Sequence, residues 1–92
     1  MKPSREDALV LLSRYIGNER IRAHSLASEA VMRALALRLG EDPDLWGIAG
    51  LLHDLDLELV EGDLMRHGLE TAAILQAEDY DAEIIDAIMR HN

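Results

Sequence analysis

The chain has 92 residues, 49% of them apolar, and a formal net charge of −9. Its length supports one modest hydrophobic core, so we expect a single domain over residues 1–92. The acidic balance argues against a nucleic-acid polymer as partner, because such proteins need a basic surface to neutralise phosphates. The chain has no cysteine and no apolar stretch of the roughly 18–20 residues that a membrane helix needs. The sequence therefore predicts a cytoplasmic protein without membrane contact.

The charges are unevenly distributed along the chain. Residues 1–40 carry seven basic and four acidic side chains, whereas residues 41–92 carry two basic and fourteen acidic ones. The simpler interpretation is a solvated acidic surface. The alternative is attraction between the two halves, within one chain or across a dimer.

Helical segments dominate the sequence, because good helix formers are abundant and no run alternates as in a β-strand. The first segment covers about residues 5–16, with Ser4 as N-cap and acidic residues in its first turn. The second and longest covers about residues 19–39 and ends at Gly40.

Three further helices are predicted in the second half. Asp42 and Pro43 mark the start of the third, as a cap followed by proline at the first helical position. The acidic stretch 55–66 is predicted to be a loop. A fourth helix covers about 67–76, and a fifth starts after Asp81 and reaches at least residue 90. The sequence thus predicts an all-α fold, a compact bundle of about five helices.

Three of the four histidines fall on apolar helical faces. His24 shares a face with residues at spacings of three and four, namely Ile21, Ser28, Val31 and Leu35. His53 follows Ala49 by four residues, and His91 follows Ile88 by three. These histidines are therefore expected to approach the interior from different helices.

Histidines that converge beside a carboxylate favour a metal site. One buried imidazole finds a backbone carbonyl easily, but several imidazoles next to Asp54 are better explained by a shared cation. Imidazole and carboxylate without thiolate favour Mn, Fe, Co, Ni or Zn over Ca or Mg. The alternative is a plain helical scaffold with core histidines, in which a chelator changes neither melting temperature nor oligomeric state.

Four motifs occur in a characteristic order: His24-Ser25, Gly50-Leu51-Leu52-His53-Asp54, His67-Gly68-Leu69-Glu70 and Ile88-Met89-Arg90-His91. This order resembles the HD superfamily, over about residues 20–92. The resemblance implies an all-helical fold and a divalent metal bound by His24, His53 and Asp54. It also places His67 and His91 where some members hold a second metal or contact the phosphate.

The resemblance implies a metal-dependent phosphohydrolase, which cleaves a phosphate ester or nucleotide with a water activated by a divalent metal. Asp54 would then be catalytic, because it could both ligate the metal and orient the water. Arg20, one turn before His24, could contact a phosphate oxygen or form a surface ion pair. The expected partner is a phosphorylated small molecule or a nucleotide.

Two departures from the family pattern bear on activity. Many members follow the doublet with Ile-Gly-Lys, whereas this sequence has Leu55-Asp56-Leu57 and lacks the lysine. The family's last ligand is an aspartate beyond the final histidine, and the sequence ends at Asn92, so we expect the N-terminal portion of a longer domain. The competing hypothesis is a non-catalytic, metal-stabilised binding or dimerisation module, in which a homodimer covers apolar residues of the last two helices.

Overall fold

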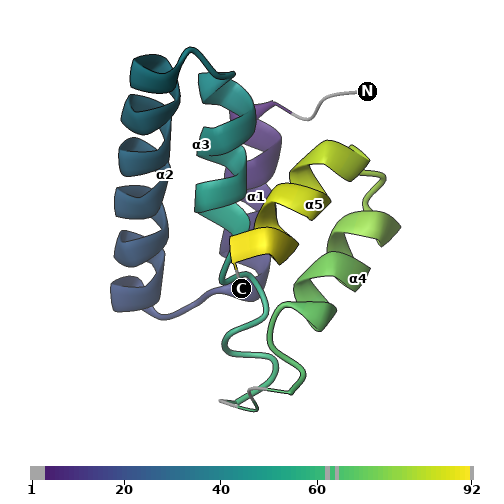
Figure 1. Ribbon diagram of the computed structural model, residues 1–92. Helices are drawn as coiled ribbons and strands as arrows, with labels where there is room; N and C mark the ends of the chain where they lie inside the picture. Colours follow the sequence, from purple (N-terminus) through teal and green to yellow (C-terminus); the bar gives the residue numbers. More distant parts are fainter. Residues whose placement is uncertain (1–3, 62, 64, 92) are drawn as a thin grey trace.

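A computed structural model describes residues 4–61, 63 and 65–91, with the backbone alone at residue 91. The helices are α1 (Arg5–Tyr15), α2 (Glu19–Leu39), α3 (Pro43–Leu52), α4 (Leu69–Ala77) and α5 (Ala82–His91) (Figure 1). The described residues form no strand. The predicted all-α bundle of about five helices is therefore confirmed.

The helix ends follow the local chemistry of the sequence. Ser4 caps α1 through its hydroxyl, which accepts a hydrogen bond from the Asp7 backbone N–H at 3.0 Å. Gly40 ends α2 in the left-handed conformation with φ 73°. Asp42 caps α3, and Pro43 is its first residue. The loop predicted over 55–66 is a series of turns in its described part.

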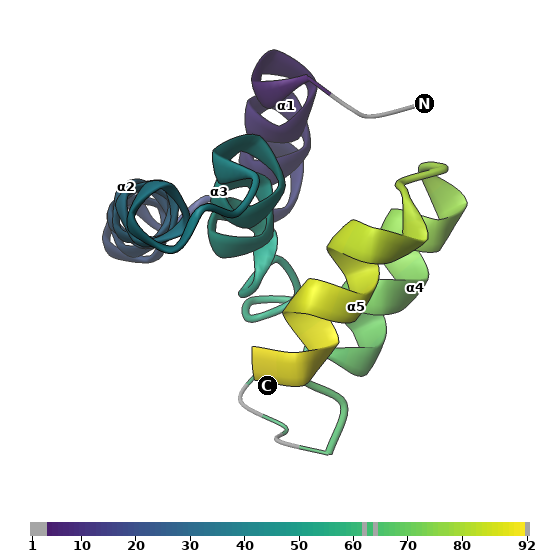
Figure 2. The same ribbon diagram turned by 45° about the horizontal axis from the view of Figure 1, so that its top comes forward.

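Helix α3 lies at the centre of the bundle. It contacts α1, α2 and α5, and every residue from Gly47 to Leu52 is buried. In the view of Figure 1, α2 lies to the left of α3 and α1 lies behind it, while α4 and α5 form a hairpin on the right (Figures 1 and 2). The core includes these fully buried side chains: Leu12, Ile16, Leu51, Leu52, Leu55, Leu75, Ile84 and Ile88. The second half of α3, which leads to His53 and Asp54, is consequently enclosed by its neighbours.

The face of α2 that packs against the bundle differs from the predicted one. Val31 and Leu35 were expected to be buried, but they are 63% and 41% exposed. The buried residues are instead Ser25, Glu29 and Ala36. That part of the sequence prediction was wrong, because hydropathy alone ranks serine and glutamate as surface residues.

Close approach of α2 and α3 explains this choice of face. A Cβ atom built on Gly50 of α3 would lie 2.8 Å from the backbone oxygen of Ser28 on α2. At such a separation there is no space for a side chain at position 50. The interface therefore uses glycines on α3, with Met32 of α2 against Gly50 and Arg33 of α2 against Gly47.

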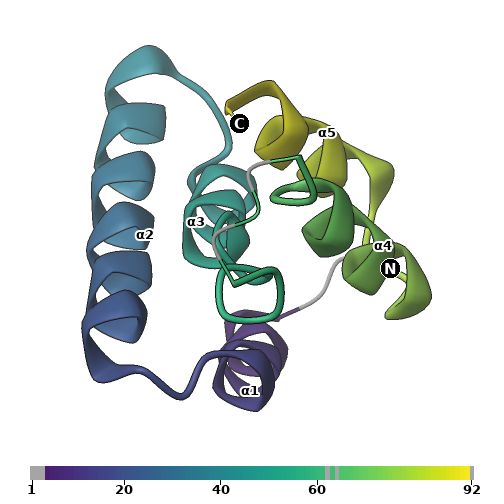
Figure 3. The same cartoon turned by 90° about the horizontal axis from the view of Figure 1, so that it is seen from below.

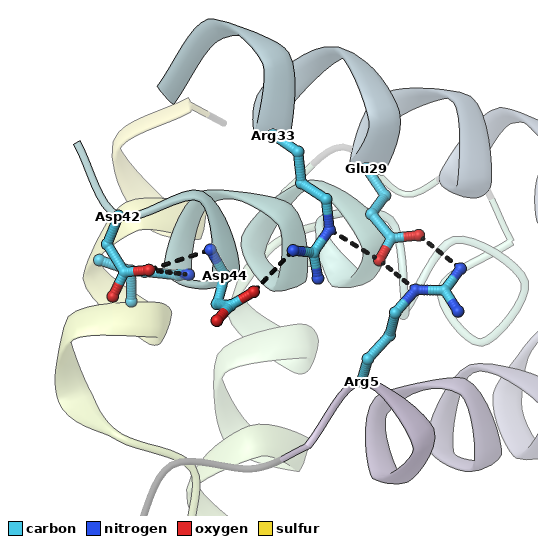
Figure 4. A network of polar contacts seen from close by, with 6 residues as sticks. Arg5, Glu29, Arg33, Asp42 and Asp44 are labelled. Carbon is cyan, nitrogen blue, oxygen red and sulfur yellow. Dashed lines mark hydrogen bonds and ion pairs between the residues drawn. The ribbon is translucent and has the colours of Figure 1, made fainter. Parts of the chain in front are cut away.

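The buried carboxylate of Glu29 is compensated by two arginines, one on either side (Figure 4). Arg5 donates to it twice, from Nε at 2.7 Å and from Nη2 at 3.0 Å. Arg33 donates from Nε at 3.4 Å and reaches Asp44 through Nη1 at 2.7 Å. The network joins α1, α2 and α3, and its Arg33–Asp44 contact connects the basic first part of the chain with the acidic second part.

Large exposed apolar side chains concentrate on α2, which presents Leu26, Val31, Leu35, Leu37 and Leu39. Among the described residues of α4 and α5, those side chains are Leu69 and Met89. The apolar surface predicted on the last two helices is thus smaller than the one on α2. Among the described helices, none combines the length and the apolar character needed to cross a membrane.

Candidate metal centre

The candidate residues come from three separate segments that meet below the end of α3. His24 lies in the second turn of α2, and the pair His53–Asp54 directly follows α3. His67 stands two residues before α4. The segment between α3 and α4 folds back beneath α3 and brings His67 toward the doublet (Figure 3).

Three imidazoles face the carboxylate of Asp54. The Nε2 atoms of His24 and His53 lie 3.5 and 3.1 Å from Asp54 Oδ2, and His67 Nε2 lies 3.3 Å from Oδ1. Ligand atoms of His24, His53 and Asp54 all lie within 4.8 Å of one another. Such a group could hold a metal ion, with His67 on the opposite oxygen of the same carboxylate.

Hydrogen bonds at the other ring nitrogens identify which atoms are free to ligate. His53 Nδ1 lies 2.6 Å from the Gly50 carbonyl oxygen, and a carbonyl only accepts, so Nδ1 carries the proton. His67 Nδ1 likewise lies 2.6 Å from Asp56 Oδ1. In the neutral rings both Nε2 atoms therefore carry a lone pair, which points at the Asp54 carboxylate. A lone pair and a carboxylate repel each other unless a proton or a cation lies between them, so this set of donors fits a metal ion.

The side chains of the centre differ in exposure. Asp54, His67 and His53 are largely covered, with 14%, 21% and 24% of their side chains exposed, whereas His24 is 60% exposed. The prediction that His24 points inward was therefore wrong, because Ser25 and Glu29 occupy the packed face of α2. His24 instead closes the outer, solvent side of the cluster.

The contact between His53 and Asp54 perturbs both groups. Its hydrogen bond to Asp54 raises the pKa of His53 above the ordinary value of 6.5, against the effect of burial. The same hydrogen bond lowers the pKa of Asp54 below 3.8, with smaller contributions from the charges of His53, His67 and His24. In the metal-free protein the two groups thus stabilise each other's charged forms.

These shifts predict how the stability of the metal-free protein depends on pH. The contribution of His53 is fully present below about pH 6.5, its unfolded value, and is lost as pH rises through the raised folded pKa. The contribution of Asp54 is present above about pH 4 and is lost as pH falls through the lowered folded pKa. The pair therefore stabilises the metal-free fold most between about pH 4 and about pH 6.5.

Thermal unfolding of chelator-treated wild type and His53→Gln measures this effect. The melting temperature of the wild type should exceed that of the variant by more at about pH 5.5 than at about pH 9. An equal difference at both pH values would show that the His53–Asp54 contact does not stabilise the fold. A bound cation would reverse the trend, since it requires neutral imidazoles.

The other predicted residues are placed as follows. Arg20 has an exposed side chain one turn before His24 on α2 and forms no ion pair with any described residue. His91 is the last residue of α5, but its side chain lies outside the described part, so its predicted role stays a prediction.

Sequence reasoning did not identify Asp56 as part of this region. Its side chain is 0% exposed, and its carboxylate contacts His67. Asp56 is one of several acids in the stretch 55–66, and neither hydropathy nor spacing distinguishes a buried acid there. The one signal in the sequence is that Asp56 follows Asp54 by two residues. In the structure the carboxylates of both residues contact His67.

A helical bundle that gathers histidines around an aspartate after a central helix has the features of a metal-binding all-α domain. The HD domain family model matches residues 21–92. The chain therefore belongs to the HD domain family, whose members bind divalent metals and are generally phosphohydrolases of phosphorylated substrates. Neither a curated protein nor a solved structure shows significant similarity to the chain.

Proposed function

We propose that this chain is a metal-dependent phosphohydrolase domain, in which His24, His53 and Asp54 bind a divalent transition metal. One observation carries the proposal: three imidazole Nε2 atoms lie 3.1–3.5 Å from a single carboxylate. Two of those nitrogens have their partner Nδ1 engaged elsewhere. Membership of the HD domain family supports the same chemistry.

The protein supplies a frame for this chemistry. A divalent cation held by His24, His53 and Asp54 would supply Lewis acidity and would lower the pKa of a bound water molecule. Asp54 is the proposed catalytic residue, because one oxygen faces His24 and His53 while the other faces His67. The Gly50 carbonyl keeps the His53 ring in the orientation that presents Nε2. His24, with 60% of its side chain exposed, lies on the solvent side of the cluster, where we propose that substrate approaches.

Two features near the centre suit a phosphorylated small molecule. Arg20 carries an exposed guanidinium on the helix that bears His24, and a guanidinium matches phosphate geometry well. A pocket of about 190 Å³ between α2, α3 and α5 includes His53, Ser28 and Ala87 in its wall. We propose that the phosphate binds near Arg20 and that the organic part of a phosphate ester or nucleotide occupies this pocket.

The ligand types narrow the choice of metal. Imidazole with carboxylate and no thiolate suits Mn, Fe, Co, Ni or Zn. His67 and His91 are proposed to serve either a second metal or the phosphate. The net charge of −9 disfavours a polyanionic substrate, so the proposed partners exclude nucleic-acid polymers.

Elemental analysis of the purified protein tests the proposal, before and after dialysis against a chelator. We expect about one or two transition-metal ions per chain, removable by chelation and restored by Mn or Zn. The reloaded protein should then release phosphate from a panel of phosphate esters and nucleotides. Failure to bind any of the five metals would refute the metal site, and metal binding without hydrolysis of the panel would refute the phosphohydrolase assignment.

The second candidate is a non-catalytic, metal-stabilised dimerisation module. The exposed apolar side chains of α2 favour it, because Val31, Leu37 and Leu39 are each at least 60% exposed. Light scattering at several protein concentrations, with and without chelator, separates the two hypotheses. A metal-dependent dimer without hydrolytic activity would favour the module, whereas a monomer at all concentrations would count against it.

A further inference from the structure

Asp56 is a buried carboxylate whose oxygens are fully engaged. It is 0% exposed and accepts three hydrogen bonds, from His67 Nδ1 at 2.6 Å, Gly68 N at 2.7 Å and Thr71 N at 2.9 Å. Burying a carboxylate is costly unless such donors compensate it. These hydrogen bonds therefore connect Asp56 to His67 and to the first residues of α4.

The same acid anchors the beginning of α4. The N-cap of α4 is Gly68, which has φ 87° and no side chain to cap the helix. Asp56 provides the missing acceptor from outside the helix, through its contacts with the N–H groups of Gly68 and Thr71. The backbone N–H of Asp56 donates in return to the Thr71 hydroxyl at 3.1 Å. His67, directly before Gly68, is thereby held at a defined distance from the doublet.

The contact with Asp56 also determines the tautomer of His67. Both ring nitrogens face a carboxylate, but Nδ1 lies 2.6 Å from Asp56 whereas Nε2 lies 3.3 Å from Asp54. The shorter contact favours the proton on Nδ1, so Nε2 keeps its lone pair. That lone pair lies 3.3 Å from Asp54 Oδ1, on the side of the carboxylate away from His24 and His53. Without Asp56, nothing in the described contacts would prevent His67 from protonating Nε2 and turning a hydrogen-bond donor toward Asp54.

We propose that Asp56 is a positioning residue, which holds His67 as an Nε2 ligand for a cation on the Oδ1 side of Asp54. The inference rests on the proposed function, because it assumes that Asp54 ligates metal. It goes further because it makes Asp56 the residue that sets the orientation and tautomer of His67 and the distance of His67 Nε2 from Asp54. Asp56 itself contacts no reacting group and acts only through His67.

A measurement on the wild type tests the tautomer directly. Long-range ¹⁵N–¹H spectra of the metal-free protein, at a pH where His67 is neutral, should show its proton on Nδ1. A proton on Nε2 would overturn the inference. This experiment needs no variant, so it decides the question even if substitutions at Asp56 prevent folding.

Zinc titration of Asp56→Asn tests the consequence for binding. The asparagine amide can turn its NH₂ group toward His67 Nδ1, which would move the ring proton to Nε2. Loss of such an outer partner costs roughly 10–100-fold in metal affinity. We expect this loss for a zinc ion bound by His67 and Asp54 Oδ1, and not for one bound by His24, His53 and Asp54 Oδ2. Asp63→Asn is the matched control, because it removes the same charge from an exposed acid in the loop that contains Asp56. It should leave the zinc affinity on either side of the Asp54 carboxylate at the wild-type value.

His67→Ala completes the design. Asp56→Asn should weaken zinc binding in the wild type but should add no further loss in a His67→Ala background. Unchanged affinity in Asp56→Asn, or an equal further loss without His67, would overturn the inference and leave the proposed function standing. A wild type that binds no zinc, manganese or other transition metal would instead overturn the proposed function, and the role of Asp56 with it.

Discussion

Replacing His53 with alanine should abolish stoichiometric binding of a transition metal. The variant loses an Nε2 donor that lies 3.1 Å from Asp54 and that the Gly50 carbonyl holds in place. Removal of a direct ligand should cost more than the roughly 10–100-fold that an outer partner costs. Metal-loaded wild type should also melt at a higher temperature than the variant, because a metal that binds only the folded state stabilises it.

Calorimetric titration with Zn or Mn measures the affinity, and elemental analysis measures the stoichiometry. Asp63→Asn serves as the control, since this exposed acid lies in the loop after the doublet, outside the cluster of His24, His53 and Asp54, and asparagine keeps the oxygen that accepts from the Met65 backbone N–H. Circular dichroism establishes that both variants keep the helical fold. Full metal stoichiometry in His53→Ala would refute the assignment of this residue as a ligand.

The largest loss of stability is expected for Leu51→Ala. Leu51 has 0% exposure and lies in α3, the helix that contacts α1, α2 and α5. Deleting a buried leucine side chain costs about 2–5 kcal/mol, through lost burial and the cavity left behind. For a domain of this size, such a loss is a large fraction of the free energy of unfolding.

Urea denaturation quantifies the difference, with Leu37→Ala as the matched control. Leu37 is 69% exposed on α2, so the same substitution there should change the free energy of unfolding by less than about 0.5 kcal/mol. Equal effects of the two substitutions would contradict the central position of α3. An unchanged denaturant slope would show that the variants unfold from the same compact state.

The helices and their ends could be predicted because they depend on neighbouring residues. Ser4, Gly40 and Asp42 each act within one turn of their own position, so their roles can be recognised without a three-dimensional structure. The grouping of His24 with His53 and Asp54 was also predictable, because the motif order resembles a family whose membership is now shown.

Features that depend on tertiary contacts could not be predicted. The buried face of α2 is determined by the closeness of α3 rather than by the hydropathy of α2 itself. The pairing of Asp56 with His67 depends on the path of a loop between them. Sequence patterns describe periodicity within one element, but they contain no information on how closely two backbones approach.

The small size of residue 50 has a consequence for the geometry of the cluster of His24, His53 and Asp54. Gly50 permits the close contact with Ser28, and its carbonyl oxygen also orients His53. Gly50 therefore affects both the orientation of His53, which directly follows α3, and the distance from His53 to His24 on α2. A side chain at position 50 would meet the backbone of α2 and push the two histidines apart, so the geometry of the cluster depends on a residue that contributes no side chain to it.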